Sequence, residues 1–180
     1  MVGKFSNTYI LFVISVFFII LSSFSHPGED SVRDTDYTLF KIERSRDSDE
    51  VFYDVNLIST GELNTRNPIQ IYWIKKTKGG KKEGLTWIQK KFGYGLKYEK
   101  ISSSEARFQF VSNINRSFIL KKNNKGTFKV FAVNENTVLE LKKLYIQFDG
   151  GTFLSPKISR VELHAINTET WDLVLEIIRP

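Results

Sequence analysis

The stretch Val51-Phe52-Tyr53-Asp54-Val55-Asn56-Leu57 decides the fold, because aliphatic or aromatic residues occupy every odd position. A period of two predicts a half-buried β-strand, with the odd positions facing the core. The same alternation recurs in later apolar rows: Ile69, Ile71 and Trp73; Ala106, Phe108 and Phe110; Phe128, Val130 and Ala132; Val161, Leu163 and Ala165; and Trp171, Leu173, Leu175 and Ile177. Trp73 is therefore expected in the core.

Turn-forming residues separate these rows and set the fold class. Gly, Asn and Asp cluster at residues 59–61, 79–80, 123–126 and 149–151, and residues 167–170 suit a hairpin between the last two strands. We expect an all-β fold of about nine strands in a single antiparallel domain. A β-sandwich and a β-barrel both fit this pattern.

Two segments depart from simple alternation. Between residues 136 and 148 the apolar phase changes, which fits either a β-bulge at Lys142-Lys143 or a short helix. The second segment, Thr86 to Gln89, has the pattern of a helix capping box, and Gly93 is placed to end the helix. We expect one short helix there, with Leu85, Ile88 and Phe92 as its apolar stripe.

The N-terminus has the features of a secretory signal peptide. Lys4 precedes an apolar run over residues 9–21, and Ser23-Phe24-Ser25 supplies a small-x-small ending. We expect a signal peptide over residues 1–25, a flexible acidic leader over 26–36 and a β-rich domain over 37–180. The protein would then be exported to the periplasm or the cell exterior, with no stable membrane span after cleavage. The alternative is an uncleaved N-terminal membrane anchor.

Composition excludes several kinds of chemistry. The 180 residues contain no cysteine and only two histidines, His26 and His164. Disulfides, thiol nucleophiles, Cys-ligated zinc and poly-histidine metal sites are therefore unavailable, and we expect no cofactor. The formal charge is +6, and lysines concentrate between residues 75 and 100. Export argues against a nucleic-acid partner, so these lysines are interpreted as solvating a hairpin loop.

Catalytic motifs are missing, which leaves carboxylates as the only acid/base groups of interest. No Gly-x-Ser-x-Gly elbow or phosphate-binding loop occurs, and His164 is interpreted as a surface residue. Glu43 and Asp54 could serve as an acid/base pair. The run at residues 47–50 lacks the glycine and distal glutamate of a calcium loop, so we expect a solvated turn.

Arg44 raises a specific question about the core. If Phe40 and Ile42 face inward, Arg44 faces inward too, and a buried guanidinium needs an acidic partner. We expect that partner to be Asp54 or another acid, beneath the helix. The pair could be a structural clamp or a ligand-binding point.

The most distinctive motifs lie in the first half of the domain, in residues 40–45, 51–57, 61–63, 67–74 and 85–95. In this order they resemble the DUF4833 family, a domain of unknown function of exported bacterial proteins. The resemblance extends over residues 38–180, with strand pattern more than motif in the C-terminal half. It departs from the family at residues 46–50, where an Asn-rich turn is usual, and at Gly93-Tyr94-Gly95, where Ala-Tyr-Gly is usual.

The resemblance implies no activity, so two functions stay open. The first is a non-catalytic binding or interaction module of the bacterial cell envelope, with an unidentified envelope ligand or protein as partner. The second is a carboxylate-dependent envelope hydrolase or lyase. Candidate binding residues are Glu43, Arg44, Asp54, Lys90 and Tyr94, and we expect no catalytic residue. Whether these side chains converge on one concave pocket separates the two functions.

Overall fold

A computed structural model describes residues 37–134, 137–152 and 155–179. The expected signal peptide and acidic leader lie outside these residues. The strands are β1 (Thr38–Arg44), β2 (Asp47–Val55), β3 (Ile69–Lys75), β4 (Lys81–Gly84), β5 (Leu96–Ile101), β6 (Glu105–Phe110), β7 (Asn113–Lys122), β8 (Phe128–Asn134), β9 (Thr137–Gly151), β10 (Pro156–Asn167) and β11 (Leu173–Ile178). A 3-10 helix, η2 (Lys76–Lys78), and an α-helix, α2 (Trp87–Phe92), complete the described elements.

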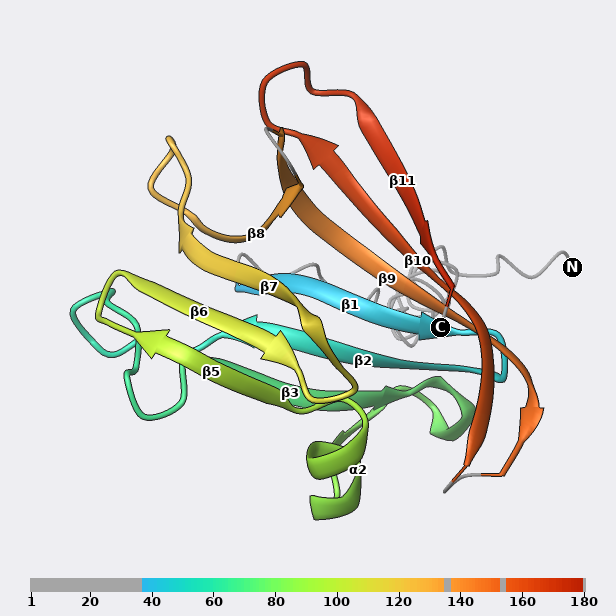
Figure 1. The fold of residues 1–180 in the computed structure, drawn as a ribbon. Helices are drawn as coiled ribbons and strands as arrows, with labels where there is room; N and C mark the ends of the chain where they lie inside the picture. The colour runs from blue at the N-terminus through green and yellow to red at the C-terminus, as the bar shows by residue number, and fades with distance from the viewer. Residues whose placement is uncertain (1–36, 135–136, 153–154, 180) are drawn as a thin grey trace, which may run out of the picture. The chain divides into compact units, whose positions relative to one another are not determined.

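All eleven strands belong to one curled sheet whose pairing is mixed (Figure 1). Its main path runs β4-β3-β2-β1-β9-β8-β7-β6-β5, and β10 and β11 extend from β9. The all-β class with a short helix is confirmed, but the expectation of a purely antiparallel sheet is wrong. β1 and β9 pair in parallel, which requires a long connection along the chain. The count also exceeds the nine strands expected.

Strand β9 is the branch point of the sheet. Lys143 pairs with Lys41 of β1 and with His164 of β10, while Glu140 pairs with Phe131 of β8 and with Ile166 of β10. Because β10 occupies one edge throughout, β1 and β8 share the other edge at successive positions. Two flanks therefore diverge from β9, one through β1, β2, β3 and β4 and the other through β8, β7, β6 and β5.

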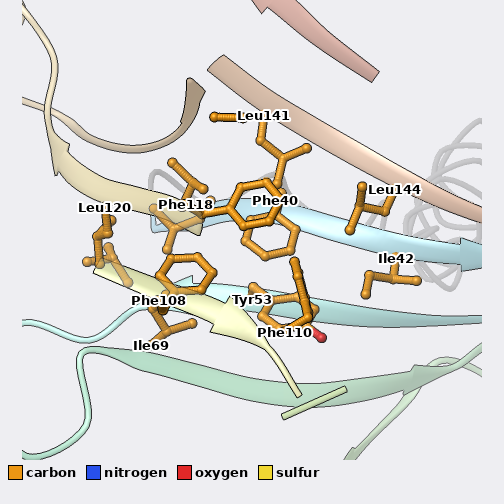
Figure 2. Packing of buried hydrophobic residues seen from close by; sticks show 14 of the residues in the cluster. Phe40, Ile42, Tyr53, Ile69, Phe108, Phe110, Phe118, Leu120, Leu141 and Leu144 are labelled. Carbon is orange, nitrogen blue, oxygen red and sulfur yellow. The ribbon is translucent and has the colours of Figure 1, made fainter. Parts of the chain in front are cut away.

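The core lies where the two flanks face each other (Figure 2). Phe110 of β6 makes edge-to-face contacts with Phe40 of β1 and Tyr53 of β2, at ring-centroid distances of 5.9 and 5.8 Å. Phe40 and Tyr53 stack on each other at 4.3 Å. The apolar rows predicted from residues 51–55, 69–73, 106–110 and 128–132 all contribute to this core. Period-two alternation is thus a sufficient guide to the inward face of these strands.

The bulge expected in the strand before β10 is present, and the alternative of a helix there is wrong. Residues 137–151 form the single strand β9. His164 pairs with Lys143 and Ala165 with Leu141, so Lys142 is the extra residue. A β-bulge of this kind returns both Leu141 and Leu144 to the core side.

The last apolar row has the opposite orientation to that expected. Leu173, Leu175 and Ile177 of β11 are 87, 55 and 45% exposed. They lie opposite Ile166, His164 and Glu162 of β10, on the outer face of the sheet. Alternation alone marks a strand but does not say which of its faces meets the core.

Candidate functional site

The helix α2 is fastened to the sheet at its first turn. The Thr86 hydroxyl accepts a hydrogen bond from the Gln89 amide at 3.3 Å, and the Gln89 side-chain oxygen accepts one from the Thr86 amide at 2.9 Å. The predicted capping box is therefore confirmed. The same Gln89 oxygen accepts a hydrogen bond from Nε1 of Trp73 at 3.3 Å, so the cap is joined to β3. Trp73 itself is buried, as predicted.

The residues after α2 make a tight return to the sheet. Gly93 is the C-cap, and its amide donates to the Gln89 carbonyl. A Cβ on Gly95 would lie 1.8 Å from the Lys90 carbonyl oxygen, so only glycine fits there. The predicted apolar stripe of the helix is correct for Leu85, which is buried, but wrong for Phe92, which is 63% exposed.

Arg44 faces the core side, as predicted, but its partner is Asp47 and not Asp54. Its Nη2 donates to the two carboxylate oxygens of Asp47 at 2.6 and 2.7 Å. Its Nη1 donates to the Tyr94 hydroxyl at 3.1 Å, and its guanidinium lies 4.4 Å from the ring centroid of Trp73. Asp54 follows Tyr53, an inward residue, and a period of two turns Asp54 to the opposite face.

Tyr94 takes part in this arrangement through its backbone carbonyl as well as through its hydroxyl. Its carbonyl accepts a hydrogen bond from the Tyr53 hydroxyl at 2.7 Å, and its ring packs edge-to-face on Trp73 at 5.2 Å. Burial raises the pKa of Tyr94 above its usual value, although the adjacent Arg44 opposes the rise. Tyr94 thus remains a neutral phenol at physiological pH. Arg44, Asp47, Trp73 and Tyr94 form what we call the arginine cluster.

The outer face of the sheet holds Glu43 in a separate ion-pair network. Lys41 and Lys143 each lie 2.9 Å from a Glu43 carboxylate oxygen. Burial pulls the pKa of Glu43 upward, but hydrogen bonds from Lys143 and Lys41 outweigh that effect and hold it below its usual value. A general acid needs the opposite shift. Glu43 is therefore a poor proton donor.

Asp54 also lies on the outer face, with its own partners. Its carboxylate accepts hydrogen bonds from the Thr38 hydroxyl at 3.0 Å and the Tyr72 hydroxyl at 2.7 Å. Burial, followed by the Asp54 hydrogen bond, raises the pKa of Tyr72 well above its usual value. Asp54 borders a shallow depression of about 590 Å³ that neither Glu43 nor Arg44 lines.

The acidic run at residues 47–50 is not the solvated turn that we expected. It opens β2, and Asp49 and Glu50 are both only 5% exposed. Asp49 accepts hydrogen bonds from the Thr77 amide and hydroxyl and pairs with Lys75 at 3.1 Å. Glu50 pairs with Lys41 and Lys76, each at 2.9 Å. Among the described residues, no three acidic or histidine side chains form a group that could hold a metal ion.

A cleft opens where the two flanks fail to close. β4 pairs with residues 72–75 of β3, and among the described strands β5 pairs only with β6, so the start of β3 faces β5 across a gap. The Tyr98 hydroxyl oxygen accepts a hydrogen bond from the Ile69 backbone across this gap, and burial raises the pKa of Tyr98 although that bond opposes the rise. We call this cleft, about 420 Å³ in volume, the seam. It is lined by Asn67, Ile69, Gln70, Ile71, Tyr72, Lys82, Gly84, Lys90, Gly95, Leu96 and Tyr98.

The five predicted site residues do not converge on one cavity. Arg44 and Tyr94 meet in the arginine cluster, Glu43 and Asp54 lie on the outer face with different partners, and Lys90 lines the seam. Lys82 and Tyr98 were missed because nothing local marks them. They become neighbours only when β4 and β5 approach β3.

Sequence comparison places the domain in a family. The family model of DUF4833, a domain of unknown function, matches residues 40–176. The chain belongs to the DUF4833 family. No curated protein and no solved structure matches the chain. Membership assigns no chemistry to the arginine cluster or to the seam.

No helix among the described residues is long and apolar enough to cross a membrane.

Proposed function

We propose that this DUF4833 domain is a non-catalytic binding module of the bacterial cell envelope, and that the seam is its ligand site. The observation that carries the proposal is the pair of lysines on the seam. In the described part of the chain, neither Lys82 nor Lys90 forms an ion pair with a carboxylate. Lys82 instead lies over the Tyr72 ring at 3.5 Å. Two unneutralised ammonium groups at one cleft favour an anionic ligand.

The walls of the seam narrow the ligand class further. Ile69, Ile71 and Leu96 are apolar, and Tyr98 adds an aromatic surface. The start of β3 and the outer side of β5 also have no strand partner there among the described strands, so backbone N–H and C=O groups other than the Ile69 group bonded to Tyr98 are available. An extended acidic peptide segment satisfies all three features, because it adds a strand while its carboxylates meet the lysines. We also propose that the curled sheet is a partly open barrel and that the seam is its opening.

The geometry gives less support to an envelope hydrolase. Glu43 is held between two lysines and Asp54 between two hydroxyl groups, and neither of the two cavities described above is lined by both carboxylates. We assign Arg44 and Tyr94 to a structural clamp and keep Lys90 as a binding residue. Export to the envelope is supported by the N-terminal sequence pattern.

The test is direct binding of a defined probe. A fluorescent peptide of ten glutamates, titrated with the full chain, should bind with an affinity that falls steeply as salt is raised, and a ten-glutamine peptide should not bind. The variant with Lys82→Gln and Lys90→Gln should weaken binding at least tenfold. The matched control, Lys125→Gln, removes an exposed charge from the turn before β8 and should leave affinity unchanged. Equal binding by the double variant and the control would refute the seam as the site.

A further inference from the structure

The outer edge of β11 combines an apolar row with unpaired backbone. Among the described strands, β11 pairs only with β10. The Asp172 carbonyl accepts a hydrogen bond from the Asn167 amide, which places the backbone groups of Asp172 on the β10 side. Because backbone groups alternate along an antiparallel strand, those of Leu173, Leu175 and Ile177 point to the free edge. The same three residues expose their side chains on the outer face.

Such an edge is a template for strand pairing, and the sequence of β11 suits one partner in particular. A contiguous exposed apolar row on an unpaired edge is a surface that soluble proteins normally cover. A second copy of β11 offers the same three outward backbone groups and the same three aliphatic side chains. Antiparallel pairing about a twofold axis would join the two edges into one continuous sheet.

The matching of the three outward residues selects one register for this pairing. Residues that lie opposite each other in the two copies must have their side chains on the same face of the sheet, so odd-numbered residues pair with odd-numbered ones and even with even. With Leu175 on the axis, Leu173 opposes Ile177 of the partner copy, and Glu176 opposes Val174. A shift of two residues in one direction places Glu176 opposite Glu176, and the other direction places Asp172 opposite Glu176. Both shifts leave one outward residue of β11 without its counterpart, and both bring a second acidic side chain to Glu176, whose carboxylate already pairs with Arg116 of β7.

We propose that two copies of this chain form a symmetric dimer through β11, in the register that places Leu175 on the twofold axis. Each of the three outward residues then exchanges both backbone hydrogen bonds with its counterpart. The aliphatic rows of the two copies form one stripe across the joined sheet. The inference is independent of the seam, which lies between the two ends of the sheet path, at β3 and β5, and includes no residue of β11.

Sedimentation of the full chain in mild detergent tests the dimer. We expect a dimeric mass for the unaltered chain and a monomeric mass for Leu175→Lys, which brings two lysines together on the axis. The control Ile58→Lys changes an exposed aliphatic residue outside β11 and should remain dimeric. A monomeric unaltered chain, or a Leu175→Lys variant that stays dimeric, would overturn the proposal.

A charge exchange tests the register and also covers the case in which Leu175→Lys fails to fold. Leu173→Lys alone and Ile177→Glu alone should each shift the equilibrium toward monomer. The chain carrying both changes should recover the dimer, because each lysine then faces a glutamate of the partner copy. Failure of the combined variant to recover, with circular dichroism unchanged, would show that the register is wrong.

Discussion

At the scale of single residues, Arg44 shows what alternation can and cannot predict. Its inward orientation follows from Phe40 and Ile42 on the same strand. The identity of its partner does not follow from alternation. Asp47 reaches Arg44 across the two-residue turn between β1 and β2, and the geometry of that turn is set by the hydrogen bonds that form. Asp54 could have been excluded by the same alternation, since its neighbour Tyr53 faces inward and Asp54 must therefore face outward.

Replacing Arg44 should destabilise the protein. Arg44→Met removes two hydrogen bonds to Asp47, one to Tyr94 and the contact with Trp73. We expect the free energy of unfolding to fall by ~1.5–3 kcal/mol, the range for hydrogen bonds to charged groups. Urea denaturation measures it. Adding Asp47→Leu to Arg44→Met should recover part of the loss, whereas adding Asp54→Leu should not, and the reverse pattern would refute the assigned partner.

Gly95 is a second residue with a defined steric requirement. Gly95→Ala places a methyl group against the Lys90 carbonyl, and backbone on both sides must shift to relieve the overlap. We expect a loss of ~1–3 kcal/mol or more, as for other overpacked sites. Gly84→Ala is the control, because a Cβ there meets nothing within 4 Å. Thermal melts that show equal losses for the two variants would contradict the close approach at Gly95.

At the scale of elements, local signals are reliable where neighbouring residues supply the partners. The cap of α2 was predictable because Thr86 and Gln89 satisfy each other within one turn. The orientation of β11 was not, because its face is set by register with β10, and edge strands have no second neighbour to demand an apolar face. The seam could not be predicted at all, since it depends on where β4 ends along β3.

The capping box gives a prediction for the helix. Thr86→Ala removes the acceptor of the Gln89 amide, and we expect a loss of ~1 kcal/mol in the free energy of unfolding. Thr86→Ser keeps the hydroxyl and should be close to the unaltered protein. If both variants melt at the same temperature as the parent, the cap contributes nothing to stability.

The contacts between β2 and η2 predict how the stability of the fold depends on pH. Burial pulls the pKa of Asp49 upward, but hydrogen bonds from Thr77 and Lys75 outweigh it and leave the pKa below its usual value. A carboxylate with a lowered pKa stabilises the fold above its unfolded pKa of ~3.9, and that stabilisation is lost as pH falls through the folded pKa. Thr77→Val removes one donor and raises the Asp49 pKa toward its usual value.

The melting temperature should therefore be level from about pH 5 to 7 and decline below about pH 4. In Thr77→Val we expect a lower melting temperature near neutral pH and a smaller acid decline, which ends at a higher pH than in the unaltered protein because the folded pKa of Asp49 lies closer to its unfolded value. Thr65→Val, at an exposed loop position, is the control. If the melting temperature depends on pH in the same way in Thr77→Val and Thr65→Val, Thr77 does not hold the Asp49 carboxylate in its ionised form.

At the scale of the whole molecule, the long-range pairing of β1 with β9 makes one core from both halves of the chain. Lys41 and Lys143 are paired although about a hundred residues separate them, and no local pattern could have revealed it. The all-β class could nevertheless be predicted, because it depends only on the alternation within each strand. The topology could not be predicted in this way, because side chains alternate between the two faces of a strand whichever direction its neighbour runs.

Trp73 tests whether this assembly unfolds as one unit. It is 2% exposed, lies in the core cluster and joins the sheet to α2 and to the arginine cluster. Trp73→Ala should cost ~3–5 kcal/mol, as for large aromatic residues removed from a core. Trp87→Ala, at a 65% exposed position, should change stability by less than about 0.5 kcal/mol.

A chain with Trp87→Phe and Trp171→Phe keeps Trp73 as its single tryptophan, because the sequence contains three. Its fluorescence should then report the packing of the core alone, with emission at shorter wavelength than that of exposed indole. Because Trp73 contacts elements of the sheet and the helix together, its fluorescence and the far-ultraviolet circular dichroism should change at the same urea concentration. If fluorescence changed first, α2 and the arginine cluster would detach before the sheet unfolds, and the helix would be an appendage of the domain.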